Sequence, residues 1–167
     1  MFFYTEYHSP LGTLTIASDG EHIVGVWIKG QPLWDTLGEI PKRKDDLALF
    51  FEAKTWLDRY FAGGKPMPRE LPLKPMGSDF RKSVWRHLLE IPYGKTTTYG
   101  AIAKQLAKEM GKEKMSAQAV GGAVGHNPIS IIIPCHRVVG AGGNLVGYTG
   151  GLEKKIFLLG HEGVKLS

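Results

Sequence analysis

The segment from residue 65 to residue 78 most constrains how this chain can fold. It has the sequence KPMPRELPLKPMGS, with four prolines and neither helical nor strand periodicity. Each proline fixes its own φ and pushes the preceding residue towards an extended backbone, so a helix or a central strand cannot run through the segment. The 167-residue chain is therefore predicted to form two small domains, residues 1–75 and residues 76–167, joined by a linker.

The first half begins with strand patterns and changes to helical spacing. Strands are expected at residues 2–7, 11–17 and 23–29, with a hairpin turn at Ser18-Asp19-Gly20. Large apolar residues then recur at helical spacing from Asp45 to Phe61, and Gly63-Gly64 ends that helix. These elements predict a small α/β layer.

The second half is mainly helical. Ser78-Asp79 suits the start of a helix that ends at Pro92-Tyr93-Gly94. Two further helices are expected over Tyr99–Met110 and from Ser116 to about Gly125, and together they have the size of a helix-turn-helix unit. The apolar spacing of the first of these two places four side chains inward, at Ile102, Ala103, Leu106 and Met110.

The last forty residues are expected to add a wing to these helices. Residues 129–133 are a β-branched run that predicts a buried strand, and residues 140–144 hold three glycines typical of a hairpin tip, from which residues 145–148 return. A final helix is expected over residues 152–160, with Leu152, Ile156 and Leu159 inward. The predicted fold is α+β, with a C-terminal winged helix.

The net positive charge of the chain comes entirely from its second half. Residues 1–75 hold nine Lys/Arg and ten Asp/Glu, a net charge of −1, whereas residues 76–167 hold twelve and six, a net charge of +6. Such asymmetry favours a phosphate-bearing partner, although a solvated basic face would explain the charge equally well. No apolar run approaches the roughly 18 residues of a transmembrane helix, and no signal peptide is expected.

Cys135 is the single cysteine, which excludes an internal disulfide and zinc sites built on two to four cysteines. His136 is adjacent, and His161-Glu162 lies in a separate segment. Cys–His–acid is the general composition of an activated nucleophile. Adjacency alone favours a structural cysteine, because neighbours on a strand point to opposite faces.

Four blocks in a fixed order change that balance: Asn127-Pro128, PCHRVV at residues 134–139, Gly147-Tyr148-Thr149-Gly150-Gly151 and His161-Glu162-Gly163. Together they closely resemble the O6-alkylguanine-DNA alkyltransferase family, whose active-site signature is PCHRVV. The resemblance is strong over residues 78–167, while the first half matches only in length and in its strand-rich start. It implies a ribonuclease-H-like N-terminal layer without catalysis.

The resemblance also implies an activity, which is DNA repair by direct reversal. The alkyl group of O6-alkylguanine, and of O4-alkylthymine, would pass from duplex DNA to Cys135 in a single turnover that inactivates the protein. His136 would act as base through a bound water, Glu162 would orient His136, and Asn127 would brace the network. Arg137 would form a structural ion pair.

Further residues are assigned by the same resemblance. Tyr99 would donate to a ring nitrogen of the flipped-out base, Val138 would accept from its exocyclic amine, Tyr148 would wall the pocket, and the Thr149 amide would reach the substituted oxygen. The helix after Ser116 would approach the DNA minor groove through its small residues and the residue before them: Gln118, Ala119, Gly122 and Ala123. Many members carry an arginine, which fills the space of the extruded base, at the position of Gln118.

Alkylated double-stranded DNA is thus the expected partner of a cytoplasmic, nucleoid-associated monomer from a prokaryote, with no metal, cofactor or membrane requirement. Three other functions fit the sequence less well. A damage sensor without chemistry would not need Cys135, a cysteine hydrolase would need a nucleophile-elbow or papain-type signature, and a winged-helix transcription factor would not explain PCHRVV.

Overall fold

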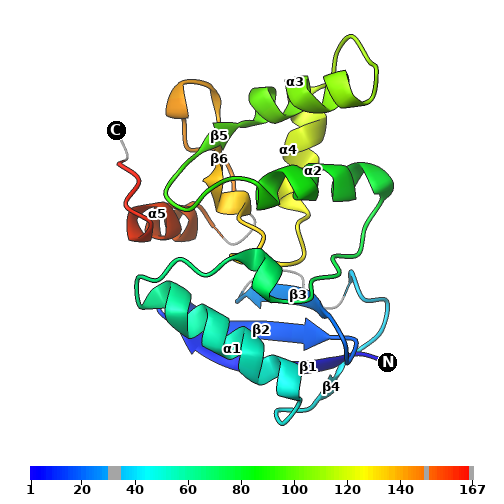
Figure 1. The fold of residues 1–167 in the computed structure, drawn as a ribbon, viewed down its shortest axis with the longest axis vertical. Helices are drawn as coiled ribbons and strands as arrows, with labels where there is room; N and C mark the ends of the chain where they lie inside the picture. Colours follow the sequence, from blue (N-terminus) through cyan, green and yellow to red (C-terminus); the bar gives the residue numbers. More distant parts are fainter. Residues whose placement is uncertain (30–34, 149–150, 166–167) are drawn as a thin grey trace. The chain divides into compact units, whose positions relative to one another are not determined.

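The computed structural model describes residues 1–29, 35–148 and 151–165. The chain forms two compact units, which are considered separately (Figure 1). The first unit comprises Met1–Met76 together with Pro128–Ile132, and the second comprises Gly77–Asn127 together with Ile133–Ser167. A short segment of the second half of the sequence is therefore part of the first unit.

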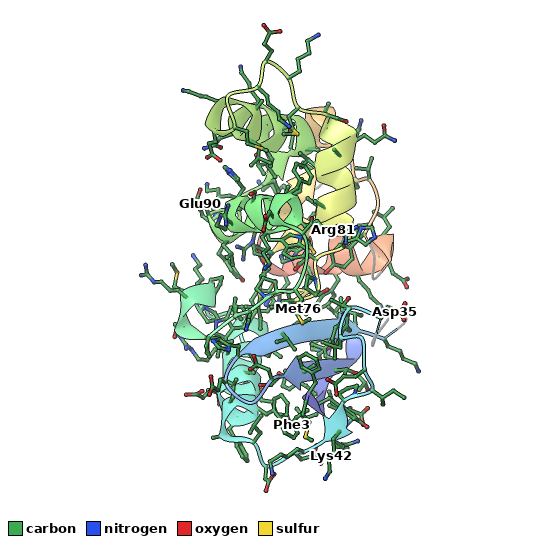
Figure 2. The ribbon with its side chains drawn as sticks, turned by 90° about the vertical axis from the view of Figure 1, so that its right-hand side faces the viewer. Phe3, Asp35, Lys42, Met76, Arg81 and Glu90 are labelled. Carbon is green, nitrogen blue, oxygen red and sulfur yellow. The ribbon has the colours of Figure 1, made fainter. Side chains whose placement is uncertain are left out.

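A four-stranded sheet with one long helix forms the first unit. The strands β1 (Phe3–Ser9), β2 (Gly12–Ser18) and β3 (Ile23–Ile28) are antiparallel, which confirms the three expected strands. The two-residue strand β4 (Lys42–Arg43) pairs in parallel with β1, so Phe3 lies opposite Lys42 at this edge (Figure 2). The sheet order is β3-β2-β1-β4.

The helix α1 (Ala48–Phe61) packs on this sheet and ends, as expected, before Gly63. It begins three residues later than predicted, because Leu47 has extended dihedral angles and serves as its N-cap. Asp45 instead accepts a hydrogen bond from the Thr5 hydroxyl of β1 (2.7 Å) and pairs with Arg43. The buried side of α1 supplies much of the core: Leu49, Phe50, Ala53, Trp56, Leu57 and Tyr60.

The outer edge of β3 is covered by two short segments. Ile23 is bonded to the predicted linker, with Ile23 N donating to Pro72 O (2.7 Å) and Lys74 N donating to Ile23 O (2.8 Å). Val26 is bonded to the segment at 128–130, with Val26 N donating to Pro128 O (2.9 Å) and Ser130 N donating to Val26 O (3.0 Å). An exposed sheet edge is thereby avoided.

The second unit is built on four helices: α2 (Asp79–Leu89), α3 (Tyr99–Glu109), α4 (Ala117–Gly125) and α5 (Leu152–His161). A hydroxyl caps each of the first three, since Ser78, Thr98 and Ser116 accept from backbone amides at 3.0–3.2 Å. The indole of Trp85 in α2 donates a hydrogen bond to Ala123 O in α4 at 2.8 Å, which connects the two helices.

The expected strand at residues 129–133 and the expected hairpin wing are both wrong. Ile129 forms only an isolated bridge with Val26, and Ile131 has a φ of 71°, which lies outside the range of a regular strand. Val138–Val139 forms a short strand, β6, but it pairs in parallel with β5 (Thr97–Thr98) rather than with residues 145–148. The glycines at 140–143 form a tight turn closed by Gly140 N and Asn144 O (2.7 Å).

Two expected helix faces also need correction. Met110 is 46% exposed in place of the expected inward side chain, because α3 ends at Glu109 and buries Ala107 instead. In α5, Leu152 and Ile156 are 44% and 40% exposed. The buried face of α5 is rotated by about one position and comprises Lys155, Leu158 and Leu159. None of the helices in the described ranges is long and apolar enough to cross a membrane.

Candidate functional site

Cys135 begins a one-turn 3-10 helix (η2, Cys135–Arg137) directly after Pro134. With three residues per turn, successive side chains of such a helix point in three different directions. Cys135, His136 and Arg137 are all buried and can therefore reach three different sets of partners. The sequence argument that neighbours on a strand point to opposite faces does not apply, because this segment is not a strand.

Glu162 binds both residues that follow the cysteine. Its carboxylate lies 2.6 Å from His136 Nε2, and its side chain and that of His136 have no exposed surface. Arg137 donates to the same carboxylate through Nε (2.8 Å) and Nη2 (3.1 Å), and Gly94 N donates at 3.1 Å. Arg137 Nη1 also donates to Ile91 O at 2.7 Å. The buried carboxylate is thus fully satisfied and fixed in position.

These contacts define the state of the His136 ring. Burial lowers the pKa of His136, against the opposing effect of Glu162, so the imidazole is neutral near pH 7. A neutral ring that donates Nε2–H to Glu162 keeps a lone pair on Nδ1. Nδ1 is buried and has no hydrogen-bond partner among the described residues. His136 is therefore held in the tautomer that can accept a proton.

The thiol of Cys135 is in a mixed environment. Burial raises its pKa, whereas the nearby Asn127 amide, the Tyr148 hydroxyl and the positive charge of Lys155 lower it. Asn127 also donates from Nδ2 to Ile133 O at 2.9 Å, so its amide links the end of α4 to the backbone just before the cysteine. Cys135 therefore rests as a buried thiol whose anion has three stabilising neighbours.

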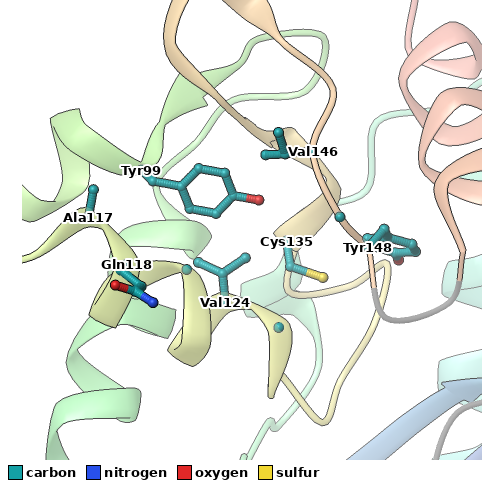
Figure 3. Close-up of a pocket in the computed structure, with 10 residues that line it drawn as sticks. Tyr99, Ala117, Gln118, Val124, Cys135, Val146 and Tyr148 are labelled. Carbon is teal, nitrogen blue, oxygen red and sulfur yellow. The ribbon is translucent and has the colours of Figure 1, made fainter.

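A cavity of about 600 Å³ opens onto Cys135. Figure 3 shows the thiol between Val124 and Tyr148, with Gln118 and Ala117 at the end of the cavity away from Tyr148. Tyr99 and Val146 complete its wall, and burial raises the pKa of Tyr99, which keeps that hydroxyl protonated as a donor. The cavity has the size and the mainly apolar lining of a small-molecule site.

No role was predicted for Lys155 from the sequence. Its side chain is fully buried, and Nζ donates to Val146 O (2.8 Å) and Gly147 O (3.3 Å). Nζ also lies 5.8 Å from the centroid of the Tyr99 ring. Its burial could have been predicted from its spacing to Leu158 and Leu159, because positions i+3 and i+4 lie on the same helix face.

The other expected residues are placed as follows. Val138 is fully buried and pairs with Thr97, and Thr149 lies outside the described residues. Gln118, Ala119 and Gly122 are exposed on α4, but Ala123 is only 3% exposed. Because Ala123 lies on the buried face of α4 with Val120 and Val124, the structure does not place it with the other three on the exposed face. No metal-ligand group of three His, Cys, Asp or Glu side chains occurs within the described ranges.

Comparisons with known proteins agree with this geometry. Residues 2–75 match the ribonuclease-like domain of 6-O-methylguanine DNA methyltransferase, and residues 79–164 match its DNA binding domain. The chain is similar to proteins named methylated-DNA–protein-cysteine methyltransferase from Methanosarcina acetivorans (45% identity, 96% of this chain and 98% of the relative) and Haemophilus influenzae (41%, 94% and 84%).

A solved structure gives the same relationship. The Mycobacterium tuberculosis OGT in complex with DNA is 39% identical and has a TM-score of 0.83, over 96% of this chain and 92% of that one. These matches extend over both halves, including the first half, where the sequence blocks gave little resemblance. The chain belongs to the 6-O-methylguanine DNA methyltransferase family.

Proposed function

We propose that this protein repairs alkylated DNA by moving the alkyl group of O6-alkylguanine, and of O4-alkylthymine, onto Cys135. One observation carries the proposal: the only cysteine of the chain opens into a cavity, and a buried His–Glu pair with an unpaired ring nitrogen lies next to it in the sequence. The names of the relatives and the DNA complex of the Mycobacterium tuberculosis OGT support the same chemistry.

The proposed reaction is an in-line displacement at the alkyl carbon. His136 Nδ1 takes the proton of Cys135 through a bound water, and the sulfur forms a bond to the alkyl carbon as the carbon–oxygen bond breaks. The electron pair of that bond stays with the base. Tyr99 donates to a ring nitrogen of the base and so stabilises the charge that develops there.

The remaining contacts orient the base. The Val138 carbonyl accepts from the exocyclic amine, Tyr148 closes the wall beside the thiol, and the Thr149 amide approaches the substituted oxygen. Asn127 and Tyr148 stabilise the thiolate before it reacts, which is supported by their effect on the pKa of Cys135. Glu162 acts through His136, as a positioning residue.

The product is a thioether, which has no easy leaving group. Cys135 is the only cysteine, so no second thiol in the chain can release the adduct. Each molecule therefore reacts once and is inactivated. One chain carries the full set of groups, which supports action as a monomer, and the substrate places the protein at the chromosome, in the nucleoid of a prokaryote.

DNA binding and alkyl transfer are assigned to residues 76–167, where the net charge is +6, and no catalysis is assigned to residues 1–75. The exposed small residues Ala119 and Gly122 allow α4 to approach a DNA backbone closely. Gln118, at the rim of the cavity, is suited to fill the gap that the extruded base leaves and to bond its former partner.

Intact-mass spectrometry tests the proposal. The protein is incubated with duplex DNA that contains one O6-methylguanine, and the expected product is one added methylene that peptide mapping places on Cys135. Cys135→Ser should gain no mass while it still binds the duplex. Multiple turnovers, or folded wild-type protein without any adduct, would refute the proposal.

A further inference from the structure

The chain makes a short excursion between the DNA-facing helix and the cysteine. It leaves the second unit after Asn127, joins the first unit as Pro128–Ile132, and returns at Ile133. Within the first unit the excursion is held by the outer edge of β3, where Val26 N donates to Pro128 O (2.9 Å) and Ser130 N donates to Val26 O (3.0 Å). One residue of β3 thus supplies both backbone bonds.

The two ends of the excursion are joined at its base. Asn127 Nδ2 donates to Ile133 O at 2.9 Å, and Cys135 N donates to the same carbonyl at 2.8 Å. The Asn127 amide is also one of the groups that lower the pKa of Cys135. The position of the thiol relative to Asn127 therefore depends on the path of the five residues between 127 and 133.

That path contains a strained residue. Ile131 has a φ of 71°, and it is the only residue other than glycine with a positive φ among those that the structure describes. A β-branched side chain is strongly disfavoured in this region, so the conformation persists only where the surroundings impose it. Ile129, Ser130 and Ile131 are all buried, at 0%, 0% and 1% exposure, and two backbone bonds fix the residues just before Ile131.

We propose that the edge of β3 is a positioning element for alkyl transfer, which acts by holding residues 128–132 in this strained path and thereby fixing Cys135 against Asn127. The inference rests on the proposed function, and it gives the first unit a role that neither the sequence nor the family's chemistry assigns. Val26 is the positioning residue, and it acts through its backbone.

A loss of the two bonds should affect transfer more than DNA binding. The turn at Ile131 would relax, and the hydrogen bond from Asn127 to Ile133 O would weaken. The Asn127 amide would then no longer be held in a fixed position relative to the thiol. Displacements of about 1 Å from a reactive geometry cost roughly 100-fold in rate. The exposed face of α4, with Ala119 and Gly122, lies outside the excursion and keeps its caps at Ser116.

The test uses Val26→Pro in the full-length protein, because proline lacks the N–H that binds Pro128. Lys44→Pro is the matched control, since it removes one backbone bond at the opposite edge of the same sheet, from Lys44 N to Tyr4 O (3.0 Å). Three quantities are measured for each variant: the first-order transfer rate at saturating O6-methylguanine DNA, the Kd for the duplex in a Cys135→Ser background, and hydrogen exchange at the Ser130 amide.

Val26→Pro should speed exchange at Ser130 and slow transfer by about 10- to 100-fold, with a Kd within about threefold of wild type. Lys44→Pro should leave the transfer rate unchanged. Adding Ile131→Gly to Val26→Pro should restore part of the rate, because glycine adopts positive φ without help from β3. If Val26→Pro does not fold, as judged by circular dichroism, Ser130→Pro removes the second bond from the other partner.

Two failures are distinguishable. A wild-type protein that gains no adduct on Cys135 overturns the proposed function. The positioning role of β3 alone is overturned if wild-type protein reacts and a folded variant keeps an unchanged transfer rate although its segment has lost protection, as judged by exchange at the Ser130 amide in Val26→Pro or at the Ile132 amide in Ser130→Pro. An equal loss of rate in Lys44→Pro would also overturn it, because the effect would then be general destabilisation.

Discussion

Replacing Glu162 by glutamine tests the proposed proton path most directly. The carboxylate accepts four hydrogen bonds, from His136 Nε2, from Arg137 Nε and Nη2, and from Gly94 N. Glutamine has the same shape, but an NH₂ group replaces one oxygen. In either orientation that NH₂ faces two of the existing donors, because each carboxylate oxygen accepts two bonds.

Two effects of different size follow. Arg137 is only 7% exposed, and the loss of its buried partner charge costs stability of about 3–5 kcal/mol at most, moderated by the bond that Arg137 keeps to Ile91 O. The second effect concerns the reaction. Without the carboxylate, His136 Nε2 faces either an NH₂ group or an uncharged amide oxygen, so its proton is held on Nε2 less firmly or not at all, and general-base catalysis worth about 10²- to 10⁴-fold is weakened or lost.

Single-turnover rapid-quench kinetics on O6-methylguanine DNA measures that loss, and fluorescence anisotropy in a Cys135→Ser background measures affinity. We expect the rate to fall by about 10²- to 10⁴-fold with the Kd within about threefold of wild type. Glu109→Gln is the matched control, since Glu109 also binds a histidine, His87, at 3.0 Å but is half exposed at 53%. A rate and an affinity that fall equally would refute the reasoning and make Glu162 a structural residue.

Three further predictions concern charge. Lys155→Met should raise the pKa of Cys135 and slow its reaction with iodoacetamide near neutral pH, because a buried cation that stabilises the thiolate is lost. The control Lys154→Met should react as fast as wild type. Equal reaction rates for Lys155→Met and wild type would contradict the prediction. Gln118→Arg should tighten duplex binding and steepen the salt dependence of Kd by about one ion, and an unchanged slope would place the side chain away from phosphates. Burial lowers the pKa of His136 below the usual value of about 6.5, so the unfolded chain takes up this proton at a higher pH than the folded protein, and the contribution of neutral His136 to stability is complete above about pH 6.5 and declines as the pH falls. The melting temperature of His136→Asn should therefore fall less between pH 7 and pH 5 than that of wild type. Equal falls would contradict this prediction.

Much of the fold was predictable because its signals are local. The strands β1, β2 and β3 follow short runs rich in β-branched and aromatic residues that end at turn residues, and helices begin at hydroxyl caps such as Ser78. Each of these features depends on a few neighbouring residues. The predicted wing is wrong because it depends on a distant partner. The glycines at 140–143 suit a hairpin tip, but Val138–Val139 pairs with Thr97–Thr98, some forty residues earlier.

The site divides in the same way. The ordered blocks around PCHRVV named Cys135, His136 and Glu162 through a family resemblance, and the structure brings His136 and Glu162 within 2.6 Å. No local pattern could reveal the η2 turn that lets three consecutive buried residues reach different partners. The β-branched run at 129–133 even indicated the wrong element, because β propensity measures how well a side chain fits a pleated surface, not where the backbone runs.

Lys155 and Ile131 show where local rules fail for a functional reason. The α5 face was predicted about one position out of register from its apolar spacing, which does not anticipate a buried lysine, and Ile131 was placed in a strand with its β-branched neighbours, a run that does not anticipate a positive φ. Both exceptions bear on the cysteine: the cation lowers the pKa of Cys135, and the strained turn lies between Asn127 and Cys135 in the sequence. A buried cation and a β-branched residue at positive φ both cost stability, and such exceptions cluster at functional sites, so the two together support a reactive role for the segment that leads to Cys135.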